Sequence, residues 1–291
     1  MISELLFIPI GMIVGTLSGF YGIGGGIVLM PILLLSGFSP AVAVPTSLMF
    51  TFGTSLSGAL THTRMKNVNW KVSAMIGSVG GILTQASNRI VMHISGSYDW
   101  LLNVWLIMIL SYFAWSLYNK RNKKEKPPLI KNQYLASAII GAIIGFLSAL
   151  LGIGGGFVTV PLLISWLGFN TRKAIGTSLA GIIIISISGV VGYSTQIELN
   201  YFLGLSLIIG AFIGSPFGAK MTSRYQTSEM TQRLSVLYLF VISSIAVDLL
   251  AILTWPILEW VSLLILLTFL VYMLIDFYRH HSFEKIKNNE T

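Results

Sequence analysis

Two glycine runs with the same sequence, about 130 residues apart, contain the residues of this chain that are best suited to chemistry. They are Gly22-Ile23-Gly24-Gly25-Gly26 and Gly152-Ile153-Gly154-Gly155-Gly156. Consecutive glycines accept positive φ and disfavour a helix interior, so each run should end one helix and begin another. The first turn of the new helix carries backbone N–H groups without intrahelical partners and a partial positive charge. Such a helix end attracts an anion.

A pair of hydroxyl residues follows each run at the start of the next apolar stretch. Hydroxyls can donate hydrogen bonds to an oxyanion, and glycines let the anion approach the backbone. No Lys or Arg lies deep in an apolar stretch, so dipoles and hydroxyls would hold the anion. The candidate substrate-binding residues are Gly24, Gly25, Gly26, Thr46, Ser47, Gly154, Gly155, Gly156, Thr177 and Ser178.

The glycine runs also have a purely structural interpretation. Small residues in membrane helices let neighbouring backbones approach closely, and they can kink a helix without binding anything. Because two copies occur at matched positions, we favour a functional role.

Acidic side chains are rare within the apolar stretches. Asp248 lies about a turn and a half from the end of its stretch, which makes it a candidate for proton coupling; the alternative is that it reaches the interface or bonds a nearby serine. Glu198, Glu259 and Asp276 lie closer to the ends of stretches and should be hydrated. His62, also near an end, is a candidate proton relay.

The sequence indicates neither a metal site nor a cofactor. His62 and His93 are far apart in the sequence and lack carboxylate neighbours, and no nucleotide-binding loop is present. The chain has no cysteine, which excludes disulfides and thiolate metal sites. Without a catalytic constellation, we do not expect an enzyme.

The composition places the glycine runs in a membrane. Of the 291 residues, 54% are hydrophobic and only 10% are charged. Several apolar stretches reach the roughly 20 residues that cross a bilayer as a helix, which predicts an all-α polytopic protein in contact with lipid. The net charge of +8 does not indicate nucleic acid, because Lys and Arg lie between the apolar stretches and at their ends.

The sequence around the glycine runs predicts a tandem duplication. After each run, a proline, a Gly-Phe pair and a Thr-Ser-Leu triplet follow in the same order over about thirty residues. Each repeat should contain a glycine-broken helix pair followed by three spanning helices, and one further C-terminal span has no counterpart. The predicted divisions are a first repeat at 1–119, a basic cytoplasmic linker at 120–132, a second repeat at 133–253, and an extra span with a basic cytoplasmic tail at 254–291.

The distribution of Lys and Arg distinguishes two arrangements of the broken helices. The pieces at 27–36 and 157–167 are too short to cross a core of about 30 Å. Each pair is therefore either one discontinuous span or a re-entrant pair that returns to its own side. Re-entrant pairs place every basic cluster on one side, with the N-terminus outside and the C-terminus in the cytoplasm. The two repeats would then be inverted, as in many transporters.

The doubled Gly-Ile-Gly-Gly-Gly element, each copy followed by a proline and then by Thr-Ser-Leu, resembles the TauE/SafE sulfite exporter family of membrane transporters. The resemblance covers the whole chain. One departure is that Gly176 precedes Thr177 in the second copy, whereas Pro45 precedes Thr46 in the first. The contribution of that glycine to close packing should therefore differ between the repeats.

The resemblance implies a secondary transporter in the cell membrane, working as an exporter by alternating access around the two glycine runs. Its substrate would be a small anion such as sulfite, a sulfonate or a related sulfur-containing organic anion, and transport could be coupled to protons. The alternatives are an anion channel of the same architecture and a transporter of a non-sulfur carboxylate.

Overall fold

A computed structural model describes residues 5–94, 99–119, 129–130, 132–253 and 258–289. These residues are almost entirely helical and contain no strand. The predicted linker at 120–132 lies largely outside the described residues. The first part of the chain forms α2 (Phe7–Tyr21), α3 (Gly26–Leu35), α4 (Pro40–Arg64), α5 (Trp70–Ile94) and α6 (Asp99–Asn119). The second part forms α7 (Gln133–Leu151), α8 (Gly156–Trp166), α9 (Thr171–Ser194), α10 (Tyr201–Met221), the short 3₁₀ turn η1 (Thr222–Arg224), α11 (Thr227–Leu253) and α12 (Leu258–Asn289).

Helix boundaries fall at both glycine runs. After α2, Gly22 adopts a left-handed conformation with φ of 73°, and Gly25 does the same before α3 with φ of 80°. Gly152 and Gly155 take the equivalent positions between α7 and α8, with φ of 63° and 68°. Residues with a Cβ rarely adopt such a backbone, so the glycines allow the chain to leave one helix and start the next within four residues.

The first described helix, α2, packs along α10 from the second half of the chain. A Cβ on Gly11 of α2 would lie 2.5 Å from the carbonyl oxygen of Leu207 on α10, and Gly19 meets the backbone of Ser215 two turns later. Glycines spaced four residues apart let the two backbones approach closely. Since both contacts advance in the same direction along the chain, α2 and α10 are parallel.

The same relationship joins α7 to α5. A Cβ on Gly141 of α7 would lie 2.6 Å from the carbonyl oxygen of Ile76 on α5, and Gly145 meets the backbone of Gly80. These two helices are also parallel. Each half therefore supplies the partner for the first helix of the other half.

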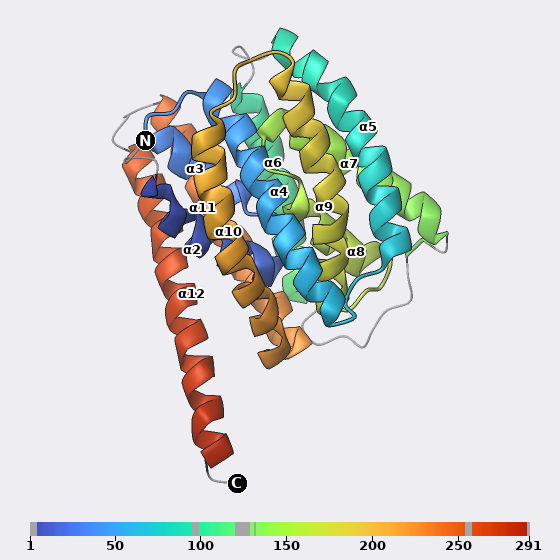
Figure 1. The fold of residues 1–291 in the computed structure, drawn as a ribbon, viewed down its shortest axis with the longest axis vertical. Coiled ribbons are helices and arrows are strands. Elements are labelled where there is room, and N and C mark those ends of the chain that lie inside the picture. The colour runs from blue at the N-terminus through green and yellow to red at the C-terminus, as the bar shows by residue number, and fades with distance from the viewer. Residues whose placement is uncertain (1–4, 95–98, 120–128, 131, 254–257, 290–291) are drawn as a thin grey trace.

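The centre of the bundle is the pair α4 and α9, which pack against each other. Near one end Gly58 lies against Leu179, and near the other end Gly189 lies against Leu48. The two helices are therefore antiparallel, and Figure 1 shows them crossing the middle of the bundle in opposite directions. α12 extends to the lower end of the molecule, away from the start of α2 (Figure 1).

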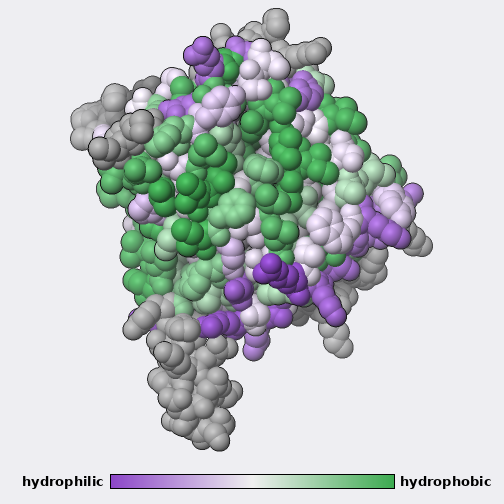
Figure 2. All heavy atoms as spheres, in the orientation of Figure 1, coloured by the Kyte–Doolittle hydropathy of each residue, from purple (hydrophilic) through white to green (hydrophobic). Residues whose placement is uncertain are grey.

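The described helices fit a membrane. Four segments are both long and apolar enough to cross a bilayer, at Thr171–Ser194, Tyr201–Arg224, Thr227–Ala251 and Trp260–Phe277. Figure 2 shows hydrophobic side chains covering the middle of one face, with hydrophilic ones gathered mainly toward its lower edge. α4 and α5 have 25 residues each but are richer in Ser, Thr and other polar residues.

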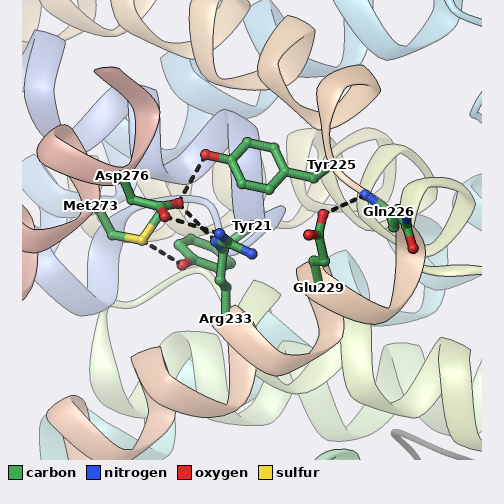
Figure 3. A network of polar contacts seen from close by, with 7 residues as sticks. All are labelled: Tyr21, Tyr225, Gln226, Glu229, Arg233, Met273 and Asp276. Atoms are coloured by element: carbon green, nitrogen blue, oxygen red, sulfur yellow. Dashed lines mark hydrogen bonds and ion pairs between the residues drawn. The ribbon is translucent and has the colours of Figure 1, made fainter. Parts of the chain in front are cut away.

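A polar network attaches α12 to the rest of the bundle (Figure 3). The Asp276 carboxylate accepts two hydrogen bonds from Arg233 of α11 and one of 2.9 Å from the Tyr225 hydroxyl. Burial and this bond to Asp276 raise the pKa of Tyr225, so the phenol stays a donor at neutral pH. The expectation that Asp276 is merely hydrated is wrong, because its helix places it opposite an arginine 43 residues earlier in the chain.

The same network reaches the end of α2. The Tyr21 hydroxyl lies 3.0 Å from the sulfur of Met273 on α12. Phe20 packs edge-on against Tyr225 and Phe277, with ring centroids 5.1 and 4.9 Å apart. The last residues before the first glycine run thus pack against α12 and against Tyr225 before α11.

Candidate anion site at the glycine runs

The two glycine runs, which come from different halves of the chain, lie directly against each other. A Cβ on Gly26 would lie 2.7 Å from the carbonyl oxygen of Ile153, and one on Gly156 would lie 2.5 Å from that of Ile23. No side chain fits at these two contacts. The N-termini of α3 and α8 therefore meet at one place inside the molecule.

Neither of these N-termini is capped by a side chain. The N-cap residues are Gly25 and Gly155, and neither position has a side-chain hydrogen bond. Helices of 10 and 11 residues carry their dipoles toward this point, together with the N–H groups of their first turns. The arrangement favours a bound negative charge without requiring a cationic side chain.

Hydroxyl groups from neighbouring helices hold the carbonyl oxygens of the runs. Thr54 donates to the Gly24 oxygen at 2.7 Å, and Ser178 of the other half donates to the Gly22 oxygen at 3.0 Å. The Tyr238 hydroxyl donates to the oxygen of Phe157 at 2.5 Å. These hydroxyls thus satisfy carbonyl oxygens within the first run and directly after the second run.

A second set of hydroxyls is buried without a hydrogen-bond partner. Among the described residues it comprises Ser18, Ser47, Thr51, Ser55 and Ser148. Each of these residues is at most 1% exposed. Buried hydroxyls are nearly always satisfied, so these five unpaired groups are candidates for hydrogen bonding to a polar ligand.

Two of these hydroxyls occupy equivalent positions in the repeats. Ser18 lies four residues before Gly22, and Ser148 lies four residues before Gly152. In both cases the serine carbonyl accepts the N–H of the glycine, at 2.8 and 3.0 Å, while the hydroxyl stays unpaired. The two halves thus present the same polar group one turn before each glycine run.

Thr51 of α4 lies between the two runs. Its Cγ2 is 2.9 Å from the position that a Cβ on Gly24 would take and is also the nearest atom to the equivalent position on Gly154, from which Oγ1 lies 3.3 Å away. Ser55, one turn further along α4, lies 3.8 Å from the Gly24 position through its Oγ. The side chains of Thr51 and Ser55 therefore lie beside the glycine backbone of the runs.

The structure brings the six candidate glycines together: Gly24, Gly25, Gly26, Gly154, Gly155 and Gly156. The candidate hydroxyls, in contrast, differ in their hydrogen-bond partners. Thr46 and Ser47 are buried, and the Ser47 hydroxyl has no partner. Thr177, in contrast, accepts a hydrogen bond of 3.0 Å from the backbone N–H of Asn69. Its hydroxyl anchors the turn between α4 and α5.

Sequence reasoning missed Ser18, Thr51, Ser55 and Ser148. The positions of Ser18 and Ser148 four residues before each glycine run are a signal that could have identified them. Thr51 and Ser55 lie in a helix rich in Ser and Thr, where sequence alone does not show which hydroxyls face the other half.

The two titratable candidates lie in different places. His62 is fully buried, with Nε2 3.3 Å from the carbonyl oxygen of Gly19 and Nδ1 unpaired. It is thus close to the end of α2. Asp248 is half-buried on α11. It lies ten residues beyond Tyr238, whose hydroxyl reaches the second glycine run, which corresponds to roughly 15 Å along the helix.

The departure at Gly176 has a visible cause. A Cβ there would lie 2.7 Å from the carbonyl oxygen of Asn67 and 2.9 Å from the Cβ of His62. The glycine lets α9 approach the end of α4. Among the described residues no three His, Asp or Glu side chains gather as a metal site.

Comparisons with known proteins agree with this architecture. The sulfite exporter TauE/SafE family model matches residues 7–247. The chain is 28% identical over 262 residues to the Bacillus subtilis protein YunE, covering 82% of this chain and 96% of that one. It is 29% identical over 258 residues to MJ0441 of Methanocaldococcus jannaschii, covering 81% and 94% of the two chains.

A protein of Haemophilus influenzae is 30% identical over 267 residues, covering 82% of this chain and 96% of the relative. All three relatives are named probable membrane transporter proteins. No solved structure matches the chain. With a family model that extends from α2 into α11, the chain belongs to the sulfite exporter TauE/SafE family of membrane transporters.

Proposed function

We propose that this membrane transporter is a secondary transporter that exports a small anion, such as sulfite, a sulfonate or a related sulfur-containing organic anion. The anion binds where the N-termini of α3 and α8 meet and is exchanged between the two sides by alternating access. The observation that carries the proposal is the group of unpaired buried hydroxyls around two uncapped helix ends. Dipoles and hydroxyls bind an oxyanion while allowing its release.

The helix directions support an inverted repeat. α2 is parallel to α10, and so is α4, because Gly53 faces Ile208 and Gly58 faces Ser215. If α2 and α4 run the same way, α3 must return the chain to the side from which α2 started, which is a re-entrant pair. The antiparallel α4 and α9 then relate the repeats 1–119 and 133–253 by inversion.

The ends of the helices support the proposed orientation. The last residue of α4 is Arg64, and α9 begins with Thr171 followed by Arg172. These two ends lie at the same edge of the antiparallel pair, and α12 extends toward that end of the molecule (Figure 1). By the positive-inside rule, this edge would face the cytoplasmic side of a cell membrane, and the N-terminus would lie outside.

Asp248 is the proposed proton-coupling residue. Its distance along α11 from Tyr238 means that it does not touch the anion. Coupling would act through movement of α11, whose Tyr238 hydroxyl holds the start of α8.

The test is anion binding by the purified protein in detergent, measured as thermal stabilisation with sulfite, sulfoacetate, thiosulfate, sulfate and lactate. A ligand that binds only the folded state raises the apparent stability by mass action. We expect stabilisation by a sulfur oxyanion and no effect of lactate. Stabilisation by lactate alone would favour the carboxylate transporter, and no stabilisation by any anion would overturn the proposal.

A channel of the same architecture is distinguished by flux in proteoliposomes. A transporter shows saturation and counterflow, in which unlabelled anion inside drives uptake of labelled anion. Flux that rises linearly with concentration and lacks counterflow would identify a channel.

A further inference from the structure

Matched positions of α4 and α9 carry different side chains beside the candidate site. With Ser47 matched to Ser178, α4 and α9 continue in register, so that Ser55 matches Ser186 and Gly58 matches Gly189. In this register Thr51 matches Ile182. The duplication thus places a hydroxyl in one half and a branched alkyl group in the other.

Both side chains lie beside the glycine runs. The Thr51 Cγ2 is 2.9 Å and the Ile182 Cγ2 is 3.7 Å from the position that a Cβ on Gly24 would take. The Ile182 Cδ1 is 2.7 Å from the equivalent position on Gly156. Thr51 of one half and Ile182 of the other therefore lie beside the same glycine, and both are fully buried.

The Thr51 hydroxyl differs from the hydroxyls of Thr54 and Ser186, because they donate hydrogen bonds and it does not. Thr54, one turn further along, gives its hydrogen bond to the Gly24 carbonyl, and Ser186 of the second half bonds back to the Ile182 carbonyl. Thr51 has no partner, although it lies in a helix that offers i−4 carbonyls to other hydroxyls. A buried hydroxyl that makes no bond costs stability unless a ligand uses it.

We propose that Thr51 is the specificity-determining donor of the anion site, and that Ile182 makes the opposite side of the site apolar. The inference rests on the proposed function and deepens it. The bound oxyanion receives a hydroxyl hydrogen bond from the first half and only van der Waals contact from the second half at this level. The two inverted halves consequently bind the anion in one preferred orientation.

The proposal predicts opposite effects on stability and on binding. Thr51→Val keeps the shape and removes an unpaired buried hydroxyl, so the melting temperature without ligand should stay the same or rise. The same variant should weaken sulfite binding by about 10- to 100-fold, which is the size expected for a lost hydrogen bond to a charged group. Thr54→Val, which removes a satisfied bond to Gly24, should instead lower the melting temperature.

Three further variants complete the experiment. Thr51→Ser keeps the hydroxyl and should keep sulfite affinity within a few-fold. The double variant Thr51→Val/Ile182→Thr returns a hydroxyl to the opposite side and should recover part of the lost affinity. Thr61→Val is the matched control on the same helix, because the Thr61 hydroxyl bonds to the Ser57 carbonyl at 3.1 Å, and its sulfite binding should equal that of the unaltered protein.

The outcomes separate this inference from the proposed function. If the unaltered protein is stabilised by sulfite and Thr51→Val binds it equally well, the role of Thr51 is overturned while the anion site stands. If Thr51→Val and Thr61→Val weaken binding equally, the effect is general and the inference also fails. Absence of any anion binding by the unaltered protein would overturn the proposed function itself.

Discussion

Arg233 of α11 binds both carboxylate oxygens of Asp276 on α12, with Nε to Oδ2 at 2.8 Å and Nη2 to Oδ1 at 2.9 Å. Both side chains are 15% exposed, so the pair is largely withdrawn from solvent. The guanidinium also lies 4.4 Å from the ring centroid of Tyr225. This bidentate pair connects α11 to α12.

Breaking this pair should destabilise the protein strongly. Asp276→Asn leaves the Arg233 charge without its counter-ion and should lower the free energy of unfolding by about 2–4 kcal/mol. Thermal unfolding in detergent measures the effect. Glu229→Gln is the control, because Glu229 is only half-buried and accepts the Gln226 N–H in a solvent-exposed hydrogen bond, so its loss should cost about 1 kcal/mol or less. Equal melting temperatures for the two variants would contradict a structural role of the pair.

The positive-φ glycines should be required for the anion site. Gly154→Ala forces a Cβ into Thr51 and into a left-handed conformation that costs roughly 1–2 kcal/mol. We expect it to abolish stabilisation by sulfite. Gly37→Ala is the matched control: Gly37 has φ of 86°, but a Cβ there would meet nothing within 4 Å. Loss of sulfite binding in both variants would mean that backbone strain alone explains the effect.

The orientation can be tested with single cysteines, because the natural chain has none. Ser39→Cys lies at the start of α4 and Arg64→Cys at its end, and both positions are exposed. In intact cells a membrane-impermeant maleimide should label position 39 and leave position 64 unlabelled until the cells are permeabilised. The opposite pattern would reverse the proposed orientation.

Asp248→Asn should separate coupling from binding. If the carboxylate carries the coupled proton, the variant should lose transport driven by a pH gradient but keep counterflow of labelled sulfite in proteoliposomes. Retention of gradient-driven transport would remove Asp248 from the mechanism. Loss of both activities would show that the residue is needed for the transport cycle as a whole.

The sequence located the elements of the site better than the contacts between them. The short pieces predicted at 27–36 and 157–167 are α3 and α8, each displaced by one residue, because consecutive glycines leave few places for a helix to start. The contact between Gly26 and Ile153 could not be predicted from the sequence, because it depends on how two segments far apart in the chain pack against each other. The ion pair between Asp276 and Arg233 could not be predicted for the same reason.

The candidate hydroxyls of the anion site show the same limit of prediction from sequence. Thr177 and Thr46 look equivalent in sequence, yet the Thr177 hydroxyl anchors Asn69. Composition marks α4 as rich in hydroxyls, but only the position of the other half's Gly154 reveals that Thr51 faces the site. Pairing across halves, rather than local pattern, decides which hydroxyl is free for a ligand.

The packing of α2 on α10 also constrains how the chain is made. The glycine face of α2 is synthesised first, but its partner around Ser215 emerges from the ribosome about 200 residues later. Until α10 is synthesised, the glycine face of α2 therefore lacks its packing partner and contacts lipid or the insertion machinery. The first half cannot mature as an independent unit, and a chain truncated before α10 should be recognised by membrane quality control as unfinished.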